Sequence, residues 1–541
     1  MALHRDRRNF LKMATMGTGA FYLNSLLNGA TTTKKRKRPN ILWIMTDQQP
    51  IRGVGCYGKS ICKTPNIDSI ASKGMRFDQF HVAAFPCCPS RASMFTGRYA
   101  HNHGIFTNEI PLAENIPSLG NILKTNGYTT GYVGKWHLGG EMYRNLPDGT
   151  PHSESYNGNW YLKRVSDKDN YKYEKVNGGT GEDKPNCGWD YWVGGWKHYK
   201  EYIRSVGLGK LADKDPFLGA HMIGACKPRH DAGIHMHSTL PEEHHLSTFL
   251  ADESVKFLRA QKGSDNPFAL TLSFYGPHNP VAPPEPWDQM YGIEDVSLPD
   301  NFSDPMENKP RIQFNPKKYK AGTWTDDQFR DYIRRYWGYC SYIDKQIGKT
   351  LRALQEIGEY DNTIILFISD HGDMVASHKN IHKNIGNGYD ELMRVPFLIQ
   401  YPDRIKPDTT SEALVSTIDI LPTLLDMLKL EKPKDIDGKS FISILTGNNS
   451  KHRKIVFTSS LWHNFVATSK QYKFNLNYGP LEKQVNELYD RFEDPGEIHN
   501  LIASPLHKDV AKKMANQIFE WLKKTGHPYI ETARRGFHEA C

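Results

Sequence analysis

The sequence has few cysteines, no CxxC pair and no long apolar run. Eight cysteines in 541 residues, at positions 56, 62, 87, 88, 187, 226, 340 and 541, are too sparse for a disulfide scaffold, although one or two disulfides remain open. Without a CxxC pair a zinc ribbon is disfavoured. No stretch of about 18 apolar residues occurs, which excludes a multi-span membrane protein. The composition is typical of a soluble globular protein, and the length favours one large α/β domain with a second, smaller domain.

Outside the first 40 residues, the chain has almost no net charge. Those 40 residues carry nine basic side chains and one acid, Asp6, so the other 501 residues hold only +1 of the formal net charge of +9. A broad phosphate-binding face needs an extended basic surface, so nucleic-acid binding is not indicated. We interpret the basic run Lys34–Arg38 as a solvated linker.

The N-terminus has the pattern of an export signal. Arg7 and Arg8 precede Phe10-Leu11-Lys12 and a mildly apolar run over 13–27, which resembles a twin-arginine signal. A basic amphipathic helix of the mature protein is the alternative. Asn28 occupies the usual small-residue position of a cleavage site near Ala30, so an uncleaved anchor remains open. We expect a signal and linker over 1–37 and an exported, periplasmic or extracellular protein, with no stable membrane span once the signal is removed.

Apolar runs that end in titratable residues organise the rest of the chain. Five runs predict strands, and helical spacing of apolar residues separates some of them. This alternation indicates a parallel, doubly wound sheet, whose ligands bind beyond the carboxyl ends of the strands. Four of the predicted strands end at titratable residues, which predicts a single active site at this edge of the sheet. The strands are 40–46, 129–133, 268–274, 363–369 and 396–400, the helices 246–260 and 329–357, and the polar residues Asp47, Lys135, His137, His278, Asp370 and His371.

Two further regions lack the strand–helix alternation. Residues 145–245 show little periodicity, and we interpret them as loops over the site. Their histidines at 221, 230, 235, 237, 244 and 245 lack metal-ligand spacing and are interpreted as surface residues. Short strand-like runs over 454–458, 465–468 and 472–476 precede a helix over 508–524. We therefore predict a catalytic domain over 38–446 and a small α+β domain over 447–541.

The segment Cys87-Cys88-Pro89-Ser90-Arg91 places a sulfur nucleophile at an anion site. Pro89 suits the first turn of a helix, and a helix N-terminus attracts anions. Arg91, one turn in, offers a guanidinium suited to oxyanions. Taken alone, a structural cysteine before a helix is an equally good interpretation.

The motif Cys-x-Pro-Ser-Arg followed by Thr96-Gly97-Arg98 resembles the signature of the formylglycine-dependent (type I) sulfatases. Further segments resemble family elements in the same order over residues 38–502. The resemblance implies an alkaline-phosphatase-like, doubly wound mixed sheet flanked by helices, with a smaller C-terminal α+β domain. The further segments are Asn40–Gln48, Thr64–Asp68, Gly134–His137, Gly276–Pro280, Ser369–Gly372, His378 with Lys383, Arg394–Pro396, Asp419 with Pro422-Thr423, and Glu487–Asp490 with Asp494-Pro495.

The resemblance also implies the residues of the site. One divalent cation would be held by four side chains together with formylglycine formed from Cys87, and its oxygen-rich ligation puts Ca²⁺ first. Many relatives have Asp-Asp where this chain has Asp47-Gln48, and Asp-Asn where it has Asp370-His371, which leaves Mg²⁺ or Mn²⁺ open. The implied metal ligands are Asp47, Gln48, Cys87, Asp370 and His371, and the implied catalytic residues are Cys87, Arg91, Lys135, His137, His278 and Lys383.

The implied reaction is the hydrolysis of a sulfate ester with release of inorganic sulfate. A gem-diol oxygen of hydrated formylglycine would attack sulfur, with its proton passing to Asp370, while the cation and the site's basic residues neutralise the sulfuryl oxygens. His278 is the candidate acid for the leaving alcohol, with Lys383 as its rival, and His137 would take the second hydroxyl proton. His378, His382 and Asn279 are equally placed to contact substrate or to pack. The partners implied are a sulfated small molecule or glycan and a formylglycine-generating maturation enzyme.

Two other functions are weighed against this one. A phosphonate or phosphate diester hydrolase of the same superfamily would use the same formylglycine and metal, and it also contains Asp-Gln and Asp-His pairs. A non-catalytic protein that binds sulfated glycans would have lost the nucleophile or ligands, and this chain keeps all of them.

Overall fold

A computed structural model describes most of the chain after the N-terminal segment. The described residues are 38–108, 110, 112–139, 187–216, 236–310, 313, 323–383, 387–460, 464–477, 485–528 and 530–540. The chain divides into two compact units, Met1–Arg38 and Pro39–Cys541. The predicted export signal over 1–37 lies outside the described residues, and every described helix and strand belongs to the second unit.

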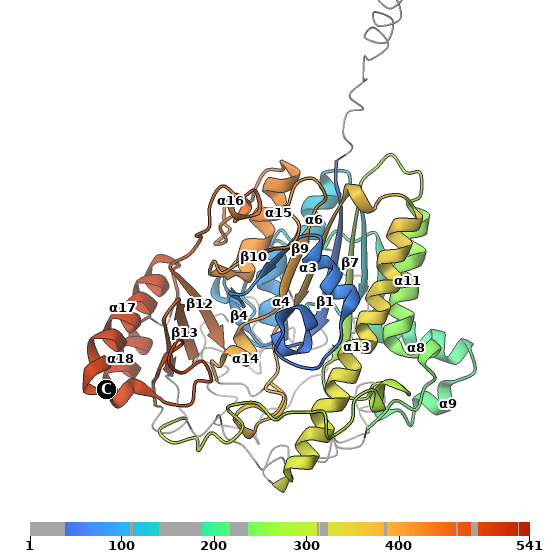
Figure 1. The fold of residues 1–541 in the computed structure, drawn as a ribbon. Coiled ribbons are helices and arrows are strands. Elements are labelled where there is room, and N and C mark those ends of the chain that lie inside the picture. Colours follow the sequence, from blue (N-terminus) through green and yellow to red (C-terminus); the bar gives the residue numbers. More distant parts are fainter. Residues whose placement is uncertain are drawn as a thin grey trace, which may run out of the picture. The chain divides into compact units, whose positions relative to one another are not determined.

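A large mixed sheet forms the centre of this unit (Figure 1). Its order is β10-β2-β9-β8-β1-β7-β5-β6, and the five strands from β8 to β6 run parallel. The mixed sheet flanked by helices is confirmed, whereas the all-parallel sheet expected from the alternation alone is wrong at β9, which is antiparallel to β8 and to β2. No long helix carries the chain back between β8 and β9 within the described residues, so β9 starts near the end at which β8 finishes. The bounds are β1 Asn40–Asp47, β2 Met75–Phe77, β5 Thr129–Gly134, β6 Tyr191–Gly194, β7 Phe268–Pro277, β8 Thr363–Ser369, β9 Phe397–Gln400 and β10 Thr409–Ser411.

Helices cover both faces of the sheet because its strands are apolar on both sides. In β1, Leu42 and Ile44 belong to one buried cluster, while Ile41, Trp43 and Met45 belong to the other. Alternate side chains of a strand point to opposite faces, so an unbroken apolar run needs a cover on each. The first cluster includes α3 (Pro65–Ser72), α11 (Leu246–Ala260) and α13 (Asp326–Glu356), and the second includes α4 (Cys87–Thr96), α6 (Leu119–Thr125) and α15 (Ile420–Leu428).

The interpretation of 145–245 as loops is wrong for its described part between 187 and 216. β6 adds an edge strand to the large sheet, and α8 (Gly195–Ser205) and α9 (Gly209–Ala212) follow it. Their apolar residues are few, and they are buried by packing against α11 rather than marked by a long pattern. His245 is also no surface residue: it is buried, and its side chain caps α11 by accepting a hydrogen bond from the Ser247 amide.

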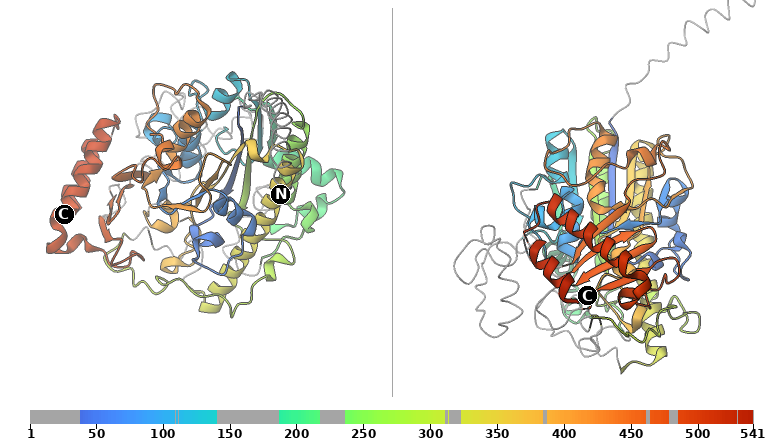
Figure 2. Two further views of the ribbon diagram at one scale, coloured as in Figure 1. Left: turned by 45° about the horizontal axis from the view of Figure 1, so that its top comes forward. Right: turned by 90° about the vertical axis from the view of Figure 1, so that its left-hand side faces the viewer.

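A second sheet, of order β15-β14-β13-β12-β4, is formed mainly by strands from the C-terminal part of the chain. Its antiparallel strands β12 (Ile455–Ser460), β13 (Asn464–Ser469), β14 (Tyr472–Asn477) and β15 (Glu487–Asp490) are covered by α17 (Lys508–Lys524) and α18 (Ile530–Ala540) (Figure 2). The fifth strand, β4 (Ala84–Phe85), comes from far earlier in the chain and pairs with Ser459 and Ser460. Residues 39–541 form one compact unit, so the domain boundary at 446/447 stays a prediction.

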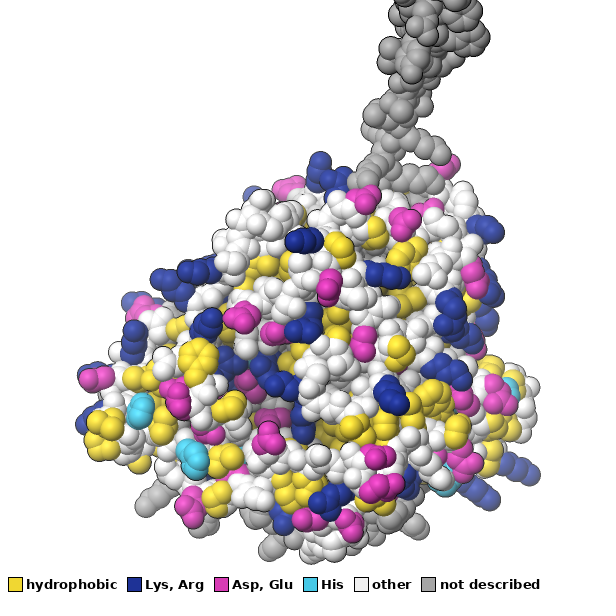
Figure 3. Space-filling model, viewed as in Figure 1, with side chains coloured by type: hydrophobic (Ala, Val, Ile, Leu, Met, Phe, Trp, Pro, Cys, Tyr) yellow, Lys and Arg dark blue, Asp and Glu magenta, His cyan; other side chains and the backbone are white. Residues whose placement is uncertain are grey.

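The described surface carries charges of both signs (Figure 3), and the described cysteines form no disulfide. Basic and acidic side chains are interspersed on the described part of the face in Figure 3, as expected for a body of nearly zero net charge. None of the described helices is both long and apolar enough to span a bilayer. Six cysteines lie among the described residues, and all six are free thiols.

Candidate active site

Two aspartates meet at the carboxyl edge of the large sheet. Asp47 ends β1 and Asp370 follows β8, and these strands are parallel neighbours with Thr46 opposite Ser369. Cys87, the first residue of α4, and His371 join them. One ligand atom from each of these four residues lies within 4.8 Å of the other three, and all four side chains are buried. The structure thus brings together four of the five predicted ligands in a cluster that could hold a metal ion.

The fifth predicted ligand, Gln48, keeps an amide oxygen without a hydrogen-bond partner among the described residues. Its Nε2 hydrogen bonds to the Asp373 carboxylate and lies 2.7 Å from His382 Nδ1, while its backbone N–H donates to Asp370 Oδ1 at 3.0 Å. Oε1 is buried and accepts no hydrogen bond from the part of the chain that the structure describes. A buried carbonyl-type oxygen of this kind is a ligand that hard cations take.

The charges of the cluster fit a divalent cation. Burial and the neighbouring Asp47 raise the pKa of Asp370 above its usual range. Burial lowers the pKa of His371, but Asp370 and Cys87 outweigh it and raise that pKa. His371 Nδ1 lies 2.7 Å from the Gly372 carbonyl, so Nδ1 carries the proton and Nε2 offers a lone pair to the cluster. A bound cation would satisfy the two carboxylates and this lone pair together.

Cys87 Sγ lies against the ammonium group of Lys383. Lys383 Nζ lies 2.9 Å from it and His371 Nε2 lies 3.1 Å away. Burial would raise the pKa of the thiol, but Lys383 and Lys135 outweigh burial and hold it well below its usual range. Any nucleophile formed at residue 87 is therefore stabilised in its anionic form.

Arg91 is buried and makes hydrogen bonds on two sides. Nε pairs with Asp370 Oδ2 at 2.8 Å, and Nη1 donates to the Lys135 carbonyl at 2.6 Å and to Ser273 Oγ at 2.9 Å. Nη2 is buried without a hydrogen bond among the described residues and lies 3.9 Å from Asp47 Oδ2. Arg91 therefore fixes Asp370 and leaves one N–H edge for an anion.

Lys135 forms an ion pair with Asp47 at the edge of the cluster. Burial raises the pKa of Asp47, yet Lys135 and the other cations of the site hold it well below its usual range. Asp47 is therefore a carboxylate throughout the neutral range, which suits a metal ligand.

His278 and Lys383, the rival proton donors, contact each other. Lys383 Nζ lies 2.8 Å from His278 Nε2, and His278 Nδ1 lies 2.6 Å from the Asn279 carbonyl. A carbonyl only accepts, so Nδ1 carries the ring proton and Nε2 accepts from the ammonium group. Burial and Lys383 hold the pKa of His278 well below its usual range. The group that faces Cys87 with a proton to give is therefore Lys383.

His137 is a partly buried neutral base. Burial and the charge of Lys135 lower its pKa to about 4, although Cys87 acts in the opposite direction. Its Nδ1 has no hydrogen-bond partner among the described residues. At neutral pH the ring can therefore accept a proton, as the predicted role requires.

The three residues left open between substrate contact and packing behave differently. His378 is buried, with Nδ1 2.5 Å from Asp304 Oδ2, and it stacks on Tyr389 at a ring-centroid separation of 3.9 Å, so it packs. Asn279 accepts a hydrogen bond from Tyr332. His382 lies inside the site, with its ring edge-on to His278 at 5.4 Å.

Sequence reasoning missed several residues that hold the catalytic groups in place. Ser90 Oγ donates to the Asp370 carbonyl at 2.5 Å, and Ser273 joins Arg91 to β7. Ser273 is a hydroxyl residue near the end of a mostly apolar run, a signal that could have identified it. Asp373 binds Gln48 and lies next to the predicted ligands, but a carboxylate after a glycine carries no distinctive pattern.

The loop that carries His382 and Lys383 has a strained backbone. Five of its non-glycine residues have φ in the left-handed region: Val375 (37°), Ala376 (72°), His378 (51°), Lys379 (55°) and His382 (65°). Sparsely populated conformations of this kind cost of order 1–3 kcal/mol each and persist only where the surroundings hold them. Arg52 provides one such restraint, since its Nη2 donates to the carbonyls of Met374 and Val375 at 3.1 and 3.0 Å.

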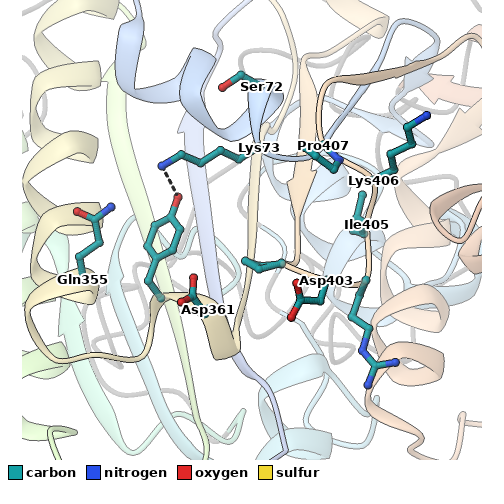
Figure 4. A pocket seen from close by; sticks show the side chains of 11 residues that line it. Ser72, Lys73, Gln355, Asp361, Asp403, Ile405, Lys406 and Pro407 are labelled. Atoms are coloured by element: carbon teal, nitrogen blue, oxygen red, sulfur yellow. Dashed lines mark hydrogen bonds between the residues drawn. The ribbon is translucent and has the colours of Figure 1, made fainter. Parts of the chain in front are cut away.

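A surface pocket lies at the opposite end of β8 from this site (Figure 4). It has a volume of about 920 Å³ and is lined by Lys73, Tyr360, Arg404 and neighbouring residues. Lys73 donates a hydrogen bond to Tyr360 at 3.3 Å. Tyr360 precedes β8 and Asp370 follows it, so a seven-residue strand separates this pocket from the buried cluster.

Comparisons with known proteins agree with this geometry. The sulfatase family model matches residues 39–430, and the model described as N-sulphoglucosamine sulphohydrolase, C-terminal, matches 387–524. An uncharacterized sulfatase of Escherichia coli, YidJ, is 29% identical over 91% of this chain and 89% of its own length. An N-acetylglucosamine-6-O-sulfatase of Bacteroides thetaiotaomicron is 26% identical over 93% of this chain and 89% of its own.

A solved structure shows the same fold. The phosphonate monoester hydrolase SpPMH from Silicibacter pomeroyi superimposes with a TM-score of 0.70 at 21% identity, over 90% of this chain and 96% of the other. At this identity the similarity speaks for the fold alone, and it confirms the alkaline-phosphatase-like architecture expected from the sequence. The family match covers well over half of the chain, and so the chain belongs to the sulfatase family, as a sulfuric ester hydrolase.

Proposed function

We propose that this enzyme hydrolyses sulfate monoesters of sulfated carbohydrates, with aryl sulfates as artificial substrates. The observation that carries the proposal is the position of Cys87 Sγ, which lies 2.9 Å from Lys383 Nζ and beside the buried pair Asp47 and Asp370. A sulfate ester has one negative charge spread over three peripheral oxygens, and cationic groups around one nucleophile stabilise that charge in the transition state. The similarity to an N-acetylglucosamine-6-O-sulfatase supports a sugar sulfate as substrate.

Two groups complete the proposed site. Asp47, Gln48, Asp370 and His371 would hold one divalent cation, with Ca²⁺ as the first choice and Mg²⁺ or Mn²⁺ as alternatives, because most of these ligands are oxygens. When bound, the cation supplies positive charge to the sulfuryl oxygens and to the nucleophile. Cys87 would be converted to formylglycine by a maturation enzyme, and in its hydrated form this residue supplies the oxygen nucleophile.

The chain's own residues then have distinct tasks. Arg91 holds Asp370 through its Nε and presents Nη2 to an anion, while Lys135 keeps Asp47 ionised. Lys383 donates a proton from Nζ to the leaving oxygen and returns to its hydrogen bond with His278 Nε2. His137 accepts a proton at Nδ1 during release of sulfate, since its lowered pKa keeps the ring neutral.

The decisive experiment compares one aryl leaving group as sulfate, phosphate diester and phosphonate monoester. The ratios of kcat/KM report differential binding of the transition states. We expect the sulfate to be preferred, and a panel of sulfated sugars then identifies the natural substrate. A preference of tenfold or more for the phosphonate or diester would favour the other hydrolase of this superfamily, whose metal pairs Asp-Gln and Asp-His this chain shares.

We also propose that the enzyme is exported through the twin-arginine signal over 1–37, which would carry the folded, matured protein to the periplasm or the medium. Replacing Arg7 and Arg8 with Lys should leave folded enzyme in the cytoplasm, as measured by activity in cell fractions. A single Arg5→Lys variant is the matched control and should be exported normally. Unchanged export of the double variant would contradict this route.

A further inference from the structure

Asp373 is a buried carboxylate beside the cation site that none of the roles above uses. It lies three residues after Asp370, and it accepts three hydrogen bonds. One comes from Gln48 Nε2, one from the Val375 amide at 2.8 Å, and one from the backbone N–H of His382. A single side chain thus connects a predicted metal ligand with the strained loop that carries Lys383.

The partners of Gln48 decide which way its amide points. Its NH₂ group has two protons, one directed to Asp373 and the other to His382 Nδ1 at 2.7 Å. A carboxylate only accepts, and an unprotonated ring nitrogen accepts too. Turning the amide over would place Oε1 against both acceptors, which is repulsive. Oε1 is consequently the atom left without a hydrogen bond from the described residues, and it is available to a cation held by the neighbouring ligands.

The same carboxylate restrains the loop between 373 and 383. Its bonds to the Val375 and His382 amides close the segment whose backbone has five left-handed non-glycine residues. Lys383 follows His382 directly, and its ammonium group lies 2.9 Å from Cys87 Sγ. Loss of the Asp373 carboxylate would therefore release both the Gln48 amide and the start of the Lys383 segment.

We propose that Asp373 is a positioning residue of the active site: it fixes the Gln48 amide with its oxygen free for the cation and holds the backbone that presents Lys383. The inference rests on the proposed function in that Gln48 is taken as a metal ligand. If Asp373 acts in this way, its removal should lower metal affinity through its effect on Gln48. An acid that only stabilises the fold would not show this dependence on Gln48.

The test is a double-mutant cycle on ion binding by the full-length protein. Ca²⁺, and Mn²⁺ in parallel, is titrated calorimetrically into chelator-stripped wild type, Asp373→Ala, Gln48→Ala and the double variant. Replacing residues that orient metal ligands typically costs about 10- to 100-fold in affinity. We expect a loss in that range for Asp373→Ala, and we expect the double variant to bind no more weakly than Gln48→Ala alone.

Asp344 provides a matched control. Its buried carboxylate, in α13, also accepts hydrogen bonds from two backbone amides, those of Asn66 and Ile67 in α3, and one from the Asn66 side chain. Asp344→Ala should lower the melting temperature but leave Ca²⁺ affinity within about twofold of wild type. Melting temperatures of all variants are measured in parallel, which separates stability from affinity.

Three results would overturn the proposal. The first is that the wild type binds neither ion. The second is that Asp373→Ala has the same Ca²⁺ affinity as the wild type. The third is that the losses of binding free energy in the two single variants add in the double variant. If Asp373→Ala does not fold, Asp373→Asn takes its place, since it keeps the shape but loses one of two acceptor oxygens, and we expect about a tenfold loss. A chain that shows this coupling but hydrolyses no sulfate ester supports the positioning role and refutes only the proposed function.

Discussion

Replacing Lys383 and replacing His278 should affect the rate differently when the leaving group of the substrate is varied. The ammonium group of Lys383 lies 2.9 Å from Cys87 Sγ and 2.8 Å from His278 Nε2. His278 keeps its own proton on Nδ1, against the Asn279 carbonyl at 2.6 Å. We therefore expect Lys383 to donate the proton that reaches the leaving oxygen and His278 to orient Lys383.

The sizes of the two effects follow from these contacts. Lys383→Ala removes a general acid, which is worth about 10²–10⁴ in rate, or about 3–5 kcal/mol, for a sugar alcohol that leaves poorly without a proton. An activated phenol leaves with little protonation, so Lys383→Ala should lose much less rate with a phenyl sulfate of this kind. His278→Ala removes a hydrogen bond to a charged donor, about 1.5–3 kcal/mol, which is about a 10- to 150-fold loss for every leaving group.

The assay measures kcat/KM for a series of sulfates whose leaving groups differ in pKa. Wild type, Lys383→Ala and His278→Ala are compared, with Lys383→Arg as a control that keeps the charge but gives up no proton in this range. We expect a steep dependence on leaving-group pKa for Lys383→Ala and for the control, and a parallel offset for His278→Ala. The reverse pattern, with the steep dependence in His278→Ala alone, would refute this assignment.

Three further predictions concern maturation, the metal and pH. Peptide mass spectrometry of active enzyme should show an aldehyde at Cys87 and an intact thiol at Cys88, and Cys88→Ser should be tolerated far better than Cys87→Ala; full activity with unmodified Cys87 would contradict the mechanism. Exhaustive chelation should abolish turnover, elemental analysis should find one cation per chain, and Asp370→Asn should lose affinity and activity together, whereas two cations per chain would be inconsistent with this site. The pKa of His101 is lowered to about 4 by burial, and that of His527 to about 2 by burial and His101, from the ordinary 6.5. Because these folded-state pKa values are depressed, the stability that the two neutral imidazoles provide is complete above pH 6.5 and is lost as the pH falls toward 4. The urea midpoint should therefore drop between pH 7 and pH 4.5, with a shallower drop in His101→Phe, and an equal drop in both proteins would show that His101 does not contribute.

The sheet and the meeting of its two aspartates could be predicted because their signals are local. Runs such as 40–46 and 363–369 are apolar at nearly every position, and parallel strands deliver their carboxyl ends to one edge, so Asp47 and Asp370 had to lie close together. The direction of β9 could not be predicted, since nothing in residues 396–400 distinguishes a parallel from an antiparallel strand.

The supporting contacts could not be predicted because they depend on the folded geometry. The Asp373 carboxylate reaches Gln48 across 325 positions of sequence, and Arg91 uses a backbone carbonyl, that of Lys135, which no side-chain pattern encodes. α8 was missed for a related reason, since its buried residues Tyr199 and Ile203 are recognised only once α11 packs beside them. The residue types in a sequence thus indicate the chemistry of a site. The contacts that hold its side chains in place join residues far apart in the sequence and are recognised only in the folded structure.

The pairing of β4 with β12 bears on the order in which the surroundings of Cys87 are synthesised. β4 ends two residues before Cys87, and its partner strand begins at Ile455, about 370 residues later in the chain. At about 5–20 residues per second a ribosome needs roughly 20–70 s to cover that interval. Throughout that time β4, which precedes Cys87, lacks its partner strand, whereas in the finished fold the Cys87 side chain is 0% exposed. A maturation enzyme that acts on this thiol would therefore meet it in the nascent polypeptide before β12 has paired with β4.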